Sequence, residues 1–306
     1  MSLTVVGSIA FDAVKTPFGE RERMLGGAAV HFSLAASFFT KVRPVGPVGD
    51  DFGDEQFEVL ERRGVLTEDV ERVAGGQSFF WRGHYDYDLN VAHTDDTQLG
   101  VFGEFDPKLS AAAQAADTLF LANIQPDLQR QVRAQCAAGF SGLDSMNLWI
   151  ETARDSLLAA IGEVDCLVVN DAEMRMLTGE SNLARTARAV MALGPRAVVA
   201  KQGEYGAALF TADGFFALPG FPLEDVRDPT GAGDSFAGGF FGYLDGHDGE
   251  LDEGTLRRAM GYGTVLASFN VEEFGTERVS RLTREEIEDR FEALRRMTQF
   301  DVLPAA

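Results

Sequence analysis

Cysteine, lysine and long apolar runs are scarce in this chain of 306 residues. The two cysteines, Cys136 and Cys166, lie in apolar or small surroundings without the spacing of a metal site or a disulfide framework. We therefore expect buried thiols in a reducing compartment. No apolar run approaches the about 20 residues of a membrane helix. The N-terminus also lacks a basic segment followed by an apolar stretch, so we expect a cytoplasmic protein.

Positive charge is scarce as well. The 48 Asp and Glu residues outnumber the 27 Lys and Arg residues, which gives a formal net charge of −21. A chain this acidic repels phosphate backbones and anionic lipid surfaces, so we expect neither nucleic acid nor membrane as a partner. A lysine-poor, carboxylate-rich surface suits a high-salt cytoplasm, where self-repulsion is screened, and it equally serves plain solubility. Any anionic ligand must be held by local features.

Short apolar segments alternate with helical ones, and 45% of the residues are hydrophobic. The pattern predicts strands and crossover helices at Leu3–Val6, Gly27–Phe39, Thr118–Ala122, Cys166–Val169, Leu183–Leu193 and Ala197–Ala200. Apolar strands that alternate with helices favour a mostly parallel sheet covered on both faces. A hairpin is predicted around residues 211–214, and residues 283–286 have a capping-box pattern that begins an amphipathic helix. We expect a single α/β domain over residues 1–306.

One region departs from this pattern. Between residues 78 and 88 the sequence alternates, with Phe79, Trp81, Tyr85 and Tyr87 on one face and polar side chains on the other. Residues 11–25, with a turn at 16–19, offer partner strands. We therefore predict a small half-exposed sheet that forms a lid from about residues 11–25 and 76–103. Its aromatic side chains also suggest a homodimer joined through the lid.

The segment from Asp228 to Phe236, with the sequence DPTGAGDSF, carries the most chemical information. Its proline and two glycines predict a tight turn, and a helical pattern begins after Asp234. Unpaired N–H groups at such a helix N-terminus bind anions such as phosphate. A carboxylate there fits a general base that takes a proton from an attacking hydroxyl group. The alternative is that Asp234 only caps its helix.

Four segments together resemble the signatures of the PfkB (ribokinase-like) family of carbohydrate kinases. Residues 228–236 resemble its C-terminal signature, and residues 26–36 followed by 45–53 resemble its N-terminal one. Residues 170–173 (NDAE) match its Asn-x-x-Glu motif, and residues 201–207 resemble its glycine-containing stretch before a hairpin. The resemblance implies a three-layer αβα fold with a mostly parallel central sheet and a small β-sheet lid. It also implies ATP-dependent phosphoryl transfer to a hydroxyl group.

The resemblance implies roles for individual residues. Asp234 would be the base, and the anion hole would be formed by Gly231, Ala232 and Gly233. Asn170 and Glu173 would organise Mg²⁺ largely through water, although a helix cap and its partner are the alternative roles. Nucleotide contacts are implied for Lys201, Gly203, Gly206 and Thr230. A monovalent cation, K⁺, is implied near Asp228.

On the acceptor side, the resemblance places substrate contacts at Asp12, Gly26, Gly27 and His31. The histidine stands where several sugar kinases carry asparagine, and a buried structural role is its alternative. Around Asp144 many relatives show an Asp-x-Asn-x-Arg pattern. Here the asparagine is one position late, and Trp149 stands where an arginine is expected.

These features favour a sugar kinase, and three alternatives stay open. A nucleoside kinase of the same fold would use lid aromatics to stack a base, although such side chains more often pack against protein. A dinucleotide-binding oxidoreductase fits poorly, because Phe236 stands where its third glycine is expected and the turn lies far from the first strand. A non-catalytic sugar or nucleotide binder would have no use for a base at Asp234.

Overall fold

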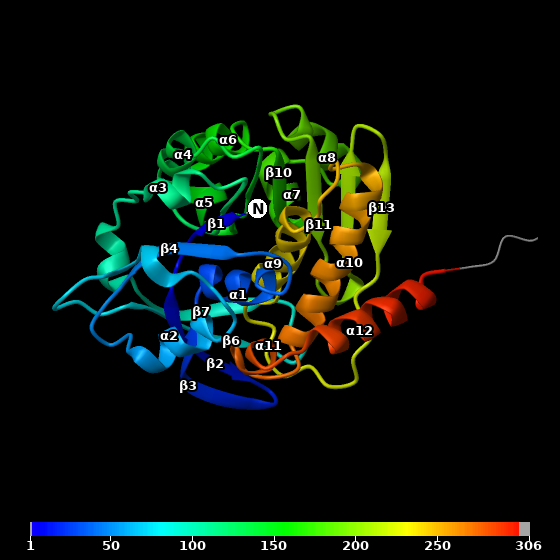
Figure 1. Ribbon diagram of the computed structural model, residues 1–306. Coiled ribbons are helices and arrows are strands. Elements are labelled where there is room, and N and C mark those ends of the chain that lie inside the picture. Colours follow the sequence, from blue (N-terminus) through cyan, green and yellow to red (C-terminus); the bar gives the residue numbers. More distant parts are fainter. Residues whose placement is uncertain (1, 300–306) are drawn as a thin grey trace, which may run out of the picture.

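The computed structural model describes residues 2–299, which fold around two β-sheets (Figure 1). The larger sheet has nine strands in the order β13-β12-β11-β10-β9-β8-β1-β4-β5. In chain order their bounds are β1 Leu3–Val6, β4 Val42–Val48, β5 Val70–Arg72, β8 Thr118–Leu121, β9 Phe140–Leu143, β10 Cys166–Asn170, β11 Ala197–Lys201, β12 Ala207–Thr211 and β13 Phe215–Leu218. All neighbours from β11 to β5 pair in parallel, and β12 and β13 add the predicted antiparallel hairpin.

The apolar strands bury both faces, as predicted. Along β8, Phe120 enters the core on one side of the sheet, whereas Leu119 and Leu121 enter the core on the other. Strands β1, β10 and β11 alternate between the same two cores. Successive side chains of a strand point to opposite faces of the sheet, so a strand that is apolar throughout needs a covering layer on each face.

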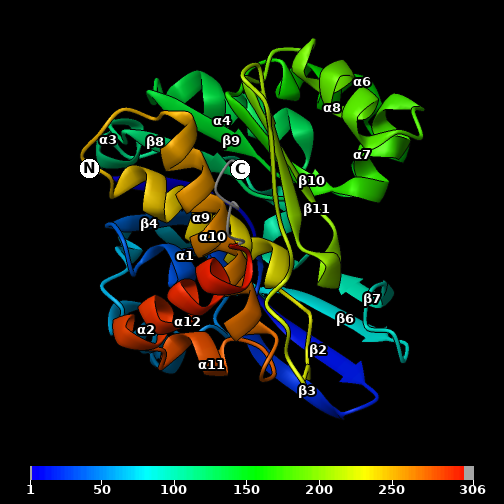
Figure 2. The ribbon, with the colours of Figure 1, turned by 90° about the vertical axis from the view of Figure 1, so that its right-hand side faces the viewer.

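The helices form those two layers (Figure 2). One face of the sheet is covered by α1 Ala28–Ala36, α2 Asp54–Glu61, α9 Ala232–Asp245 and α10 Glu253–Asn270, with α11 Glu277–Ser280 and α12 Arg284–Met297 outside them. The other face is covered by α3 Ala111–Gln114, α4 Pro126–Gln135, α5 Asn147–Thr152, α6 Arg154–Ile161, α7 Asp171–Thr178 and α8 Leu183–Met191. The predicted capping box at the start of α12 is present. The two helical layers on either side of the sheet confirm the predicted three-layer αβα fold.

The smaller sheet has the order β3-β2-β6-β7 and is mixed, because β2 and β6 are parallel. Its strands are β2 Ala10–Thr16, β3 Gly19–Gly26, β6 Phe79–Tyr85 and β7 Ala92–Gln98. The prediction that Tyr87 belongs to the alternating strand was wrong. Its strand ends at Tyr85 because Asp88 accepts the N–H of Asn90 in a turn, and Tyr87 is 86% exposed.

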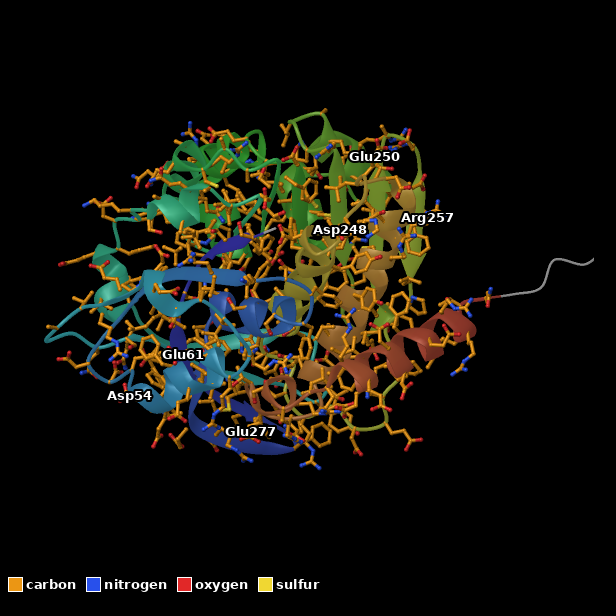
Figure 3. All side chains as sticks on the ribbon, in the orientation of Figure 1. Asp54, Glu61, Asp248, Glu250, Arg257 and Glu277 are labelled. Atoms are coloured by element: carbon orange, nitrogen blue, oxygen red, sulfur yellow. The ribbon has the colours of Figure 1, made fainter. Side chains whose placement is uncertain are left out.

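Cys136 and Cys166 are both buried free thiols, as expected. Figure 3 labels five exposed carboxylates, Asp54, Glu61, Asp248, Glu250 and Glu277, which lie on different parts of the surface. Among the helices of residues 2–299, none is long and apolar enough to cross a membrane.

Candidate active site

A tight turn leads into α9 at the edge of the large sheet. Gly231 is its N-cap residue and has φ 75°, in the left-handed region that favours glycine. A Cβ atom at Gly231 would also lie 2.4 Å from the His31 ring. Among the described residues, the N–H groups of Gly231 and Gly233 have no acceptor, whereas Ala232 donates to the carbonyl of Pro229 at 3.2 Å. The helix therefore presents two free donors to an anion.

Asp234 lies in the first turn of α9, two residues after the first helical residue, Ala232. It is not the N-cap residue, and its carboxyl group accepts its own N–H. Burial raises the pKa of Asp234 to about 7, Asp144 adds to this rise, and Lys201 opposes it. A carboxyl group that titrates near neutral pH beside free N–H donors can accept a proton from a bound hydroxyl group.

Two strand ends face this helix terminus. Asn170 ends β10 directly beside Lys201, which ends β11. The Asn170 side chain accepts the Glu173 N–H at 2.7 Å, and the Glu173 carboxylate accepts the Asn170 N–H at 2.9 Å. Both residues therefore do form the capping box that was the alternative to a metal role. Burial raises the pKa of Glu173 to about 7, with Lys201 lowering it.

The residues at this edge fit a magnesium ion that keeps most of its water. Within residues 2–299, no group of three or more His, Cys, Asp or Glu side chains could hold a metal by itself. The second carboxylate oxygen of Glu173 is not used in the capping box. Mg²⁺ is commonly bound through one or two carboxylates, waters and substrate phosphates, so Glu173 suits an ion carried by the nucleotide. The metal role of Asn170 and Glu173 stays a prediction.

Sequence reasoning did not assign Asp144 to the site. Its carboxylate Oδ2 lies 3.0 Å from the Lys201 ammonium, and the two side chains are 6% and 18% exposed. The same Nζ atom lies 2.9 Å from the position of a Cβ atom on Gly233. Lys201 therefore lies against the backbone of Gly233 in the first turn of α9. Gly203 and Gly206 flank the short turn that follows it.

The acceptor side centres on Asp12 in β2. Its carboxylate accepts the Gly27 N–H at 3.3 Å, and a Cβ atom on Gly26 would lie 1.9 Å from it. Only glycine at position 26 leaves room for this carboxylate. Burial raises the pKa of Asp12 to about 7, and the charges of Asp228 and Asp234 contribute to the rise. Asp12 and Asp234 are therefore close enough for their charges to interact, and the substrate contact of Asp12 stays a prediction.

The small sheet places two aromatic side chains beside Asp12. Trp81 is the β6 residue paired with Asp12, so the two lie on the same face of the sheet. The half-buried Trp81 ring lies over Gly83, and its indole N–H donates to Thr94 at 3.1 Å. Tyr85 lies on the same face, and its hydroxyl oxygen is 3.2 Å from that of Thr230. Sequence reasoning did not predict the contact between Tyr85 and the α9 turn.

The other aromatics of this segment pack elsewhere. Phe79 contacts Phe102, with their ring centres 5.8 Å apart, and Phe80 packs against the core on the α1 side. The loop after β6 reaches the turn that follows β11, because the Asn90 Oδ1 atom lies 3.0 Å from the Cβ position of Gly203. The small sheet thus contacts both the turn before α9 and the turn after β11.

His31 lies behind the α9 turn and is 2% exposed. Its Nδ1 lies 3.0 Å from Asn270 Oδ1, which also accepts the Ser235 hydroxyl at 3.0 Å. The Asn270 amide donates to the Thr230 carbonyl at 2.7 Å. Burial lowers the pKa of His31 to about 4, so the ring is neutral. A supporting role is therefore visible, and a substrate contact of His31 stays a prediction.

Asp228 fixes the other side of the turn. It is fully buried, and its two carboxylate oxygens accept the N–H groups of Thr230 and Gly275, each at 2.9 Å. Burial raises its pKa above the ordinary aspartate value. Asp228 and Asn270 therefore hold the turn from two directions.

A sheet between two helical layers, with a carboxylate among free N–H donors at its edge, defines an α/β protein of the three-layer class whose site can hold an anion beside a proton acceptor. The family model for pfkB family carbohydrate kinase matches residues 3–282. The chain belongs to this family. Its members transfer phosphate to hydroxyl acceptors, so the chain is a phosphotransferase, and the family uses ATP.

Nucleoside kinases are among its relatives. A cytidine kinase of Thermococcus kodakarensis is 29% identical over 80% of this chain and 90% of its own length. A nucleoside kinase of Methanothermobacter thermautotrophicus is 27% identical over 97% of this chain and 95% of its own length. The nucleoside kinase of Burkholderia thailandensis, solved in complex with inosine, superposes with a TM-score of 0.75 at 20% identity, covering 95% of this chain and 97% of that one.

Proposed function

We propose that the protein is an ATP-dependent nucleoside kinase that phosphorylates a hydroxyl group on the sugar of its substrate. The observation that carries this proposal is the position of Trp81, on the same sheet face as Asp12 and directly beside it. Asp12 suits the hydroxyl groups of a sugar, and an indole ring suits a stacked base. The cytidine and nucleoside kinases among the relatives support the same acceptor. A sugar alone, which the sequence favoured, offers no flat ring to stack on the indole.

The transfer step follows from the residues around α9. Asp234 takes the proton from the acceptor hydroxyl, whose oxygen forms a bond to the γ-phosphorus as the bond to the ADP oxygen breaks. The free N–H groups of Gly231 and Gly233 stabilise the charge on the phosphoryl oxygens. When bound, Mg²⁺ neutralises phosphate charge, and Glu173 is the residue that would hold its water shell. ADP and the protonated carboxyl group of Asp234 remain, and the proton then passes to solvent.

The small sheet acts as a lid over the acceptor. Its contacts at Thr230 and Gly203 support a closed arrangement over both substrates. The end of this sheet that carries the β2–β3 and β6–β7 connections is here called its tip, and it has three exposed apolar side chains, Phe18, Tyr87 and Val91. We propose that this tip joins two copies in a homodimer. A K⁺ ion near Asp228 stays a prediction from the family resemblance.

The test is an ATP-consumption assay with Mg²⁺ against cytidine, inosine, ribose and fructose. We expect ADP release with at least one nucleoside, and ³¹P NMR of the product should show a phosphate monoester on the sugar. Turnover of ribose or fructose with no nucleoside turnover would instead establish a sugar kinase. Binding of nucleoside and ATP without ADP release would identify a non-catalytic binder.

A further inference from the structure

The Lys201 ammonium lies in a group of carboxylates at the edge of the large sheet. Burial alone would lower its pKa, but the charges of Asp144, Glu173 and Asp234 outweigh burial and raise it. The charged neighbours that shift the pKa values of Glu173 and Asp234 are likewise Asp144 and Lys201. One lysine therefore balances three carboxylates at the place where the anionic phosphates must bind.

Asp144 is held firmly in this group. It directly follows β9, its Oδ1 accepts the Ser145 N–H at 2.8 Å, and its side chain is 6% exposed. The fully buried Gln129 amide donates to the Asp144 carbonyl at 2.9 Å and also to the Ala122 carbonyl at 2.9 Å. These hydrogen bonds hold both the backbone and the side chain of Asp144 in place independently of Lys201. Asp144 can therefore determine where the Lys201 ammonium lies.

Residues 145–153, which follow Asp144, contain no lysine or arginine. Trp149 stands where the family resemblance places an arginine, and its indole N–H donates to Asn123 at 2.9 Å. This indole cannot neutralise phosphate charge. Lys201, with its ammonium against the Gly233 backbone, is thus the positive side chain that the described part of the site offers to a phosphoryl group.

We propose, on the basis of the kinase activity proposed above, that Lys201 is a catalytic cation that contacts the transferring phosphoryl group and that Asp144 is its positioning residue. The ammonium belongs between Asp144 and the free N–H groups of α9. Without Asp144, the Asp234 carboxylate would attract it. Asp234 would then be paired with a cation at the moment when it must accept a proton. Asp144 therefore keeps the cation available and the base free.

The alternative is an ion pair that only supports the fold. A buried pair of this kind contributes little net stability compared with apolar packing, but the loss of one partner is strongly destabilising. The chain offers a matched pair far from the site, in which Arg43 lies 2.7 Å from Asp69 and the side chains are 16% and 8% exposed. Asp69→Asn shows what the loss of such a pair does to the fold alone.

The experiment compares Lys201→Met, Asp144→Asn and the double variant with Asp69→Asn. We expect Lys201→Met to lower kcat about 10²- to 10³-fold, as the loss of one oxyanion donor does. Asp144→Asn should lower kcat about 10- to 100-fold, as the loss of a supporting partner does. At a pH above the acid limb, Asp144→Asn should change kcat less than twofold in the Lys201→Met background, because no ammonium is left to position. Asp69→Asn should keep kcat and lower only the melting temperature.

Two further readouts separate the roles. The acid limb of kcat/KM should move to lower pH in Asp144→Asn and to higher pH in Lys201→Met, because the two charges act on Asp234 in opposite directions. Lys201→Arg, which keeps the charge, should recover part of kcat. Equal effects of Asp144→Asn in both backgrounds, or wild-type kcat in Lys201→Met, would overturn the inference while wild-type turnover kept the proposed function intact. If the wild-type protein transfers no phosphate to any acceptor, the proposed function itself fails.

Discussion

Three carboxyl groups of the site, Asp12, Glu173 and Asp234, have pKa values near 7 because burial disfavours their charged forms. An ordinary carboxylate is too weak a base to take a proton from a hydroxyl group, whereas a carboxylate of raised pKa is a stronger one. The same burial makes the ionised site unfavourable for the fold. Function and stability therefore respond to pH in opposite directions at these residues.

Asp234→Asn removes the proposed base while it keeps the size of the side chain. We expect kcat to fall about 10²- to 10⁴-fold, because that is the usual contribution of a positioned general base. ATP affinity should change little, since the N–H donors of Gly231 and Gly233 remain. Steady-state kinetics and calorimetric titration with ATP measure the two quantities. The exposed Asp213→Asn serves as the control, and an Asp234→Asn variant with normal turnover would rule out the base.

The pH dependence of stability tests the raised pKa directly. In the folded protein Asp234 holds its proton up to about pH 7, whereas the unfolded chain releases it near pH 3.8. Wild-type stability relative to Asp234→Asn should therefore fall as pH rises from 4 to 7, by at most about 1.4 kcal/mol per pH unit. Denaturant unfolding at constant ionic strength measures this difference. A flat difference would mean that the carboxyl group has an ordinary pKa.

For single residues, the sequence indicates where in the fold a side chain lies better than it indicates which side chain it contacts. Asn170, Lys201 and Asp234 come together because carboxyl ends of parallel strands and a helix N-terminus meet at one sheet edge. The bond from Asn270 to the Thr230 carbonyl joins residues 40 apart in the chain, and no local pattern announces it. Asp144 lay in a segment singled out for its departure from the family, but only the packed structure pairs it with Lys201.

The small sheet shows what strand periodicity can and cannot predict. Period-two alternation located β6, and the turn near Pro17 located the β2–β3 hairpin. Alternation alone did not predict where β6 ends, because the turn at Asp88 decides that. It also did not predict which aromatics would be covered by protein. Phe79 and Phe80 pack against neighbours, whereas Trp81 and Tyr85 lie beside Asp12 and Thr230 because β6 pairs in parallel with β2.

Trp81→Leu tests the role of this strand in choosing the acceptor. We expect KM for a nucleoside to rise about 5- to 150-fold, since stacking of one base on an aromatic ring contributes about 1–3 kcal/mol. KM for ATP should stay unchanged. Phe215→Leu, at an aromatic residue that is 58% exposed on β13, serves as the control. Unchanged nucleoside KM in Trp81→Leu would show that the indole only packs against Gly83 and Thr94.

Charge is the dominant property of the whole molecule. The net charge of −21 surrounds a site that must admit ATP, which is itself an anion. At the site itself, the N-terminus of α9 and Lys201 offset this repulsion. The rest of the surface keeps its carboxylates, and its ion pairs, such as that of Arg62 with Glu58, are mostly exposed. Such pairs contribute little, so the fold depends mainly on its two cores.

Association of two copies must overcome the same charge. The edge strands β3 and β7 carry charged side chains, which disfavour edge-to-edge pairing, so contact through the apolar tip is expected. The Debye screening length decreases from about 10 Å at 0.1 M salt to about 3 Å at 1 M salt, which removes most of the electrostatic repulsion between the copies. Light scattering should therefore report a mass that rises from 33.2 kDa toward twice that value as KCl increases.

Replacing the apolar tip identifies the contact. Phe18→Ser combined with Tyr87→Ser should keep the protein monomeric at 1 M KCl, because the two side chains, 55% and 86% exposed, supply most of the apolar surface there. Leu193→Ser, at an apolar residue that is 40% exposed away from the small sheet, should leave dimerisation unchanged. A mass that stays at one copy in high salt would exclude the dimer. A dimer that persists in the double variant would place its interface elsewhere on the molecule.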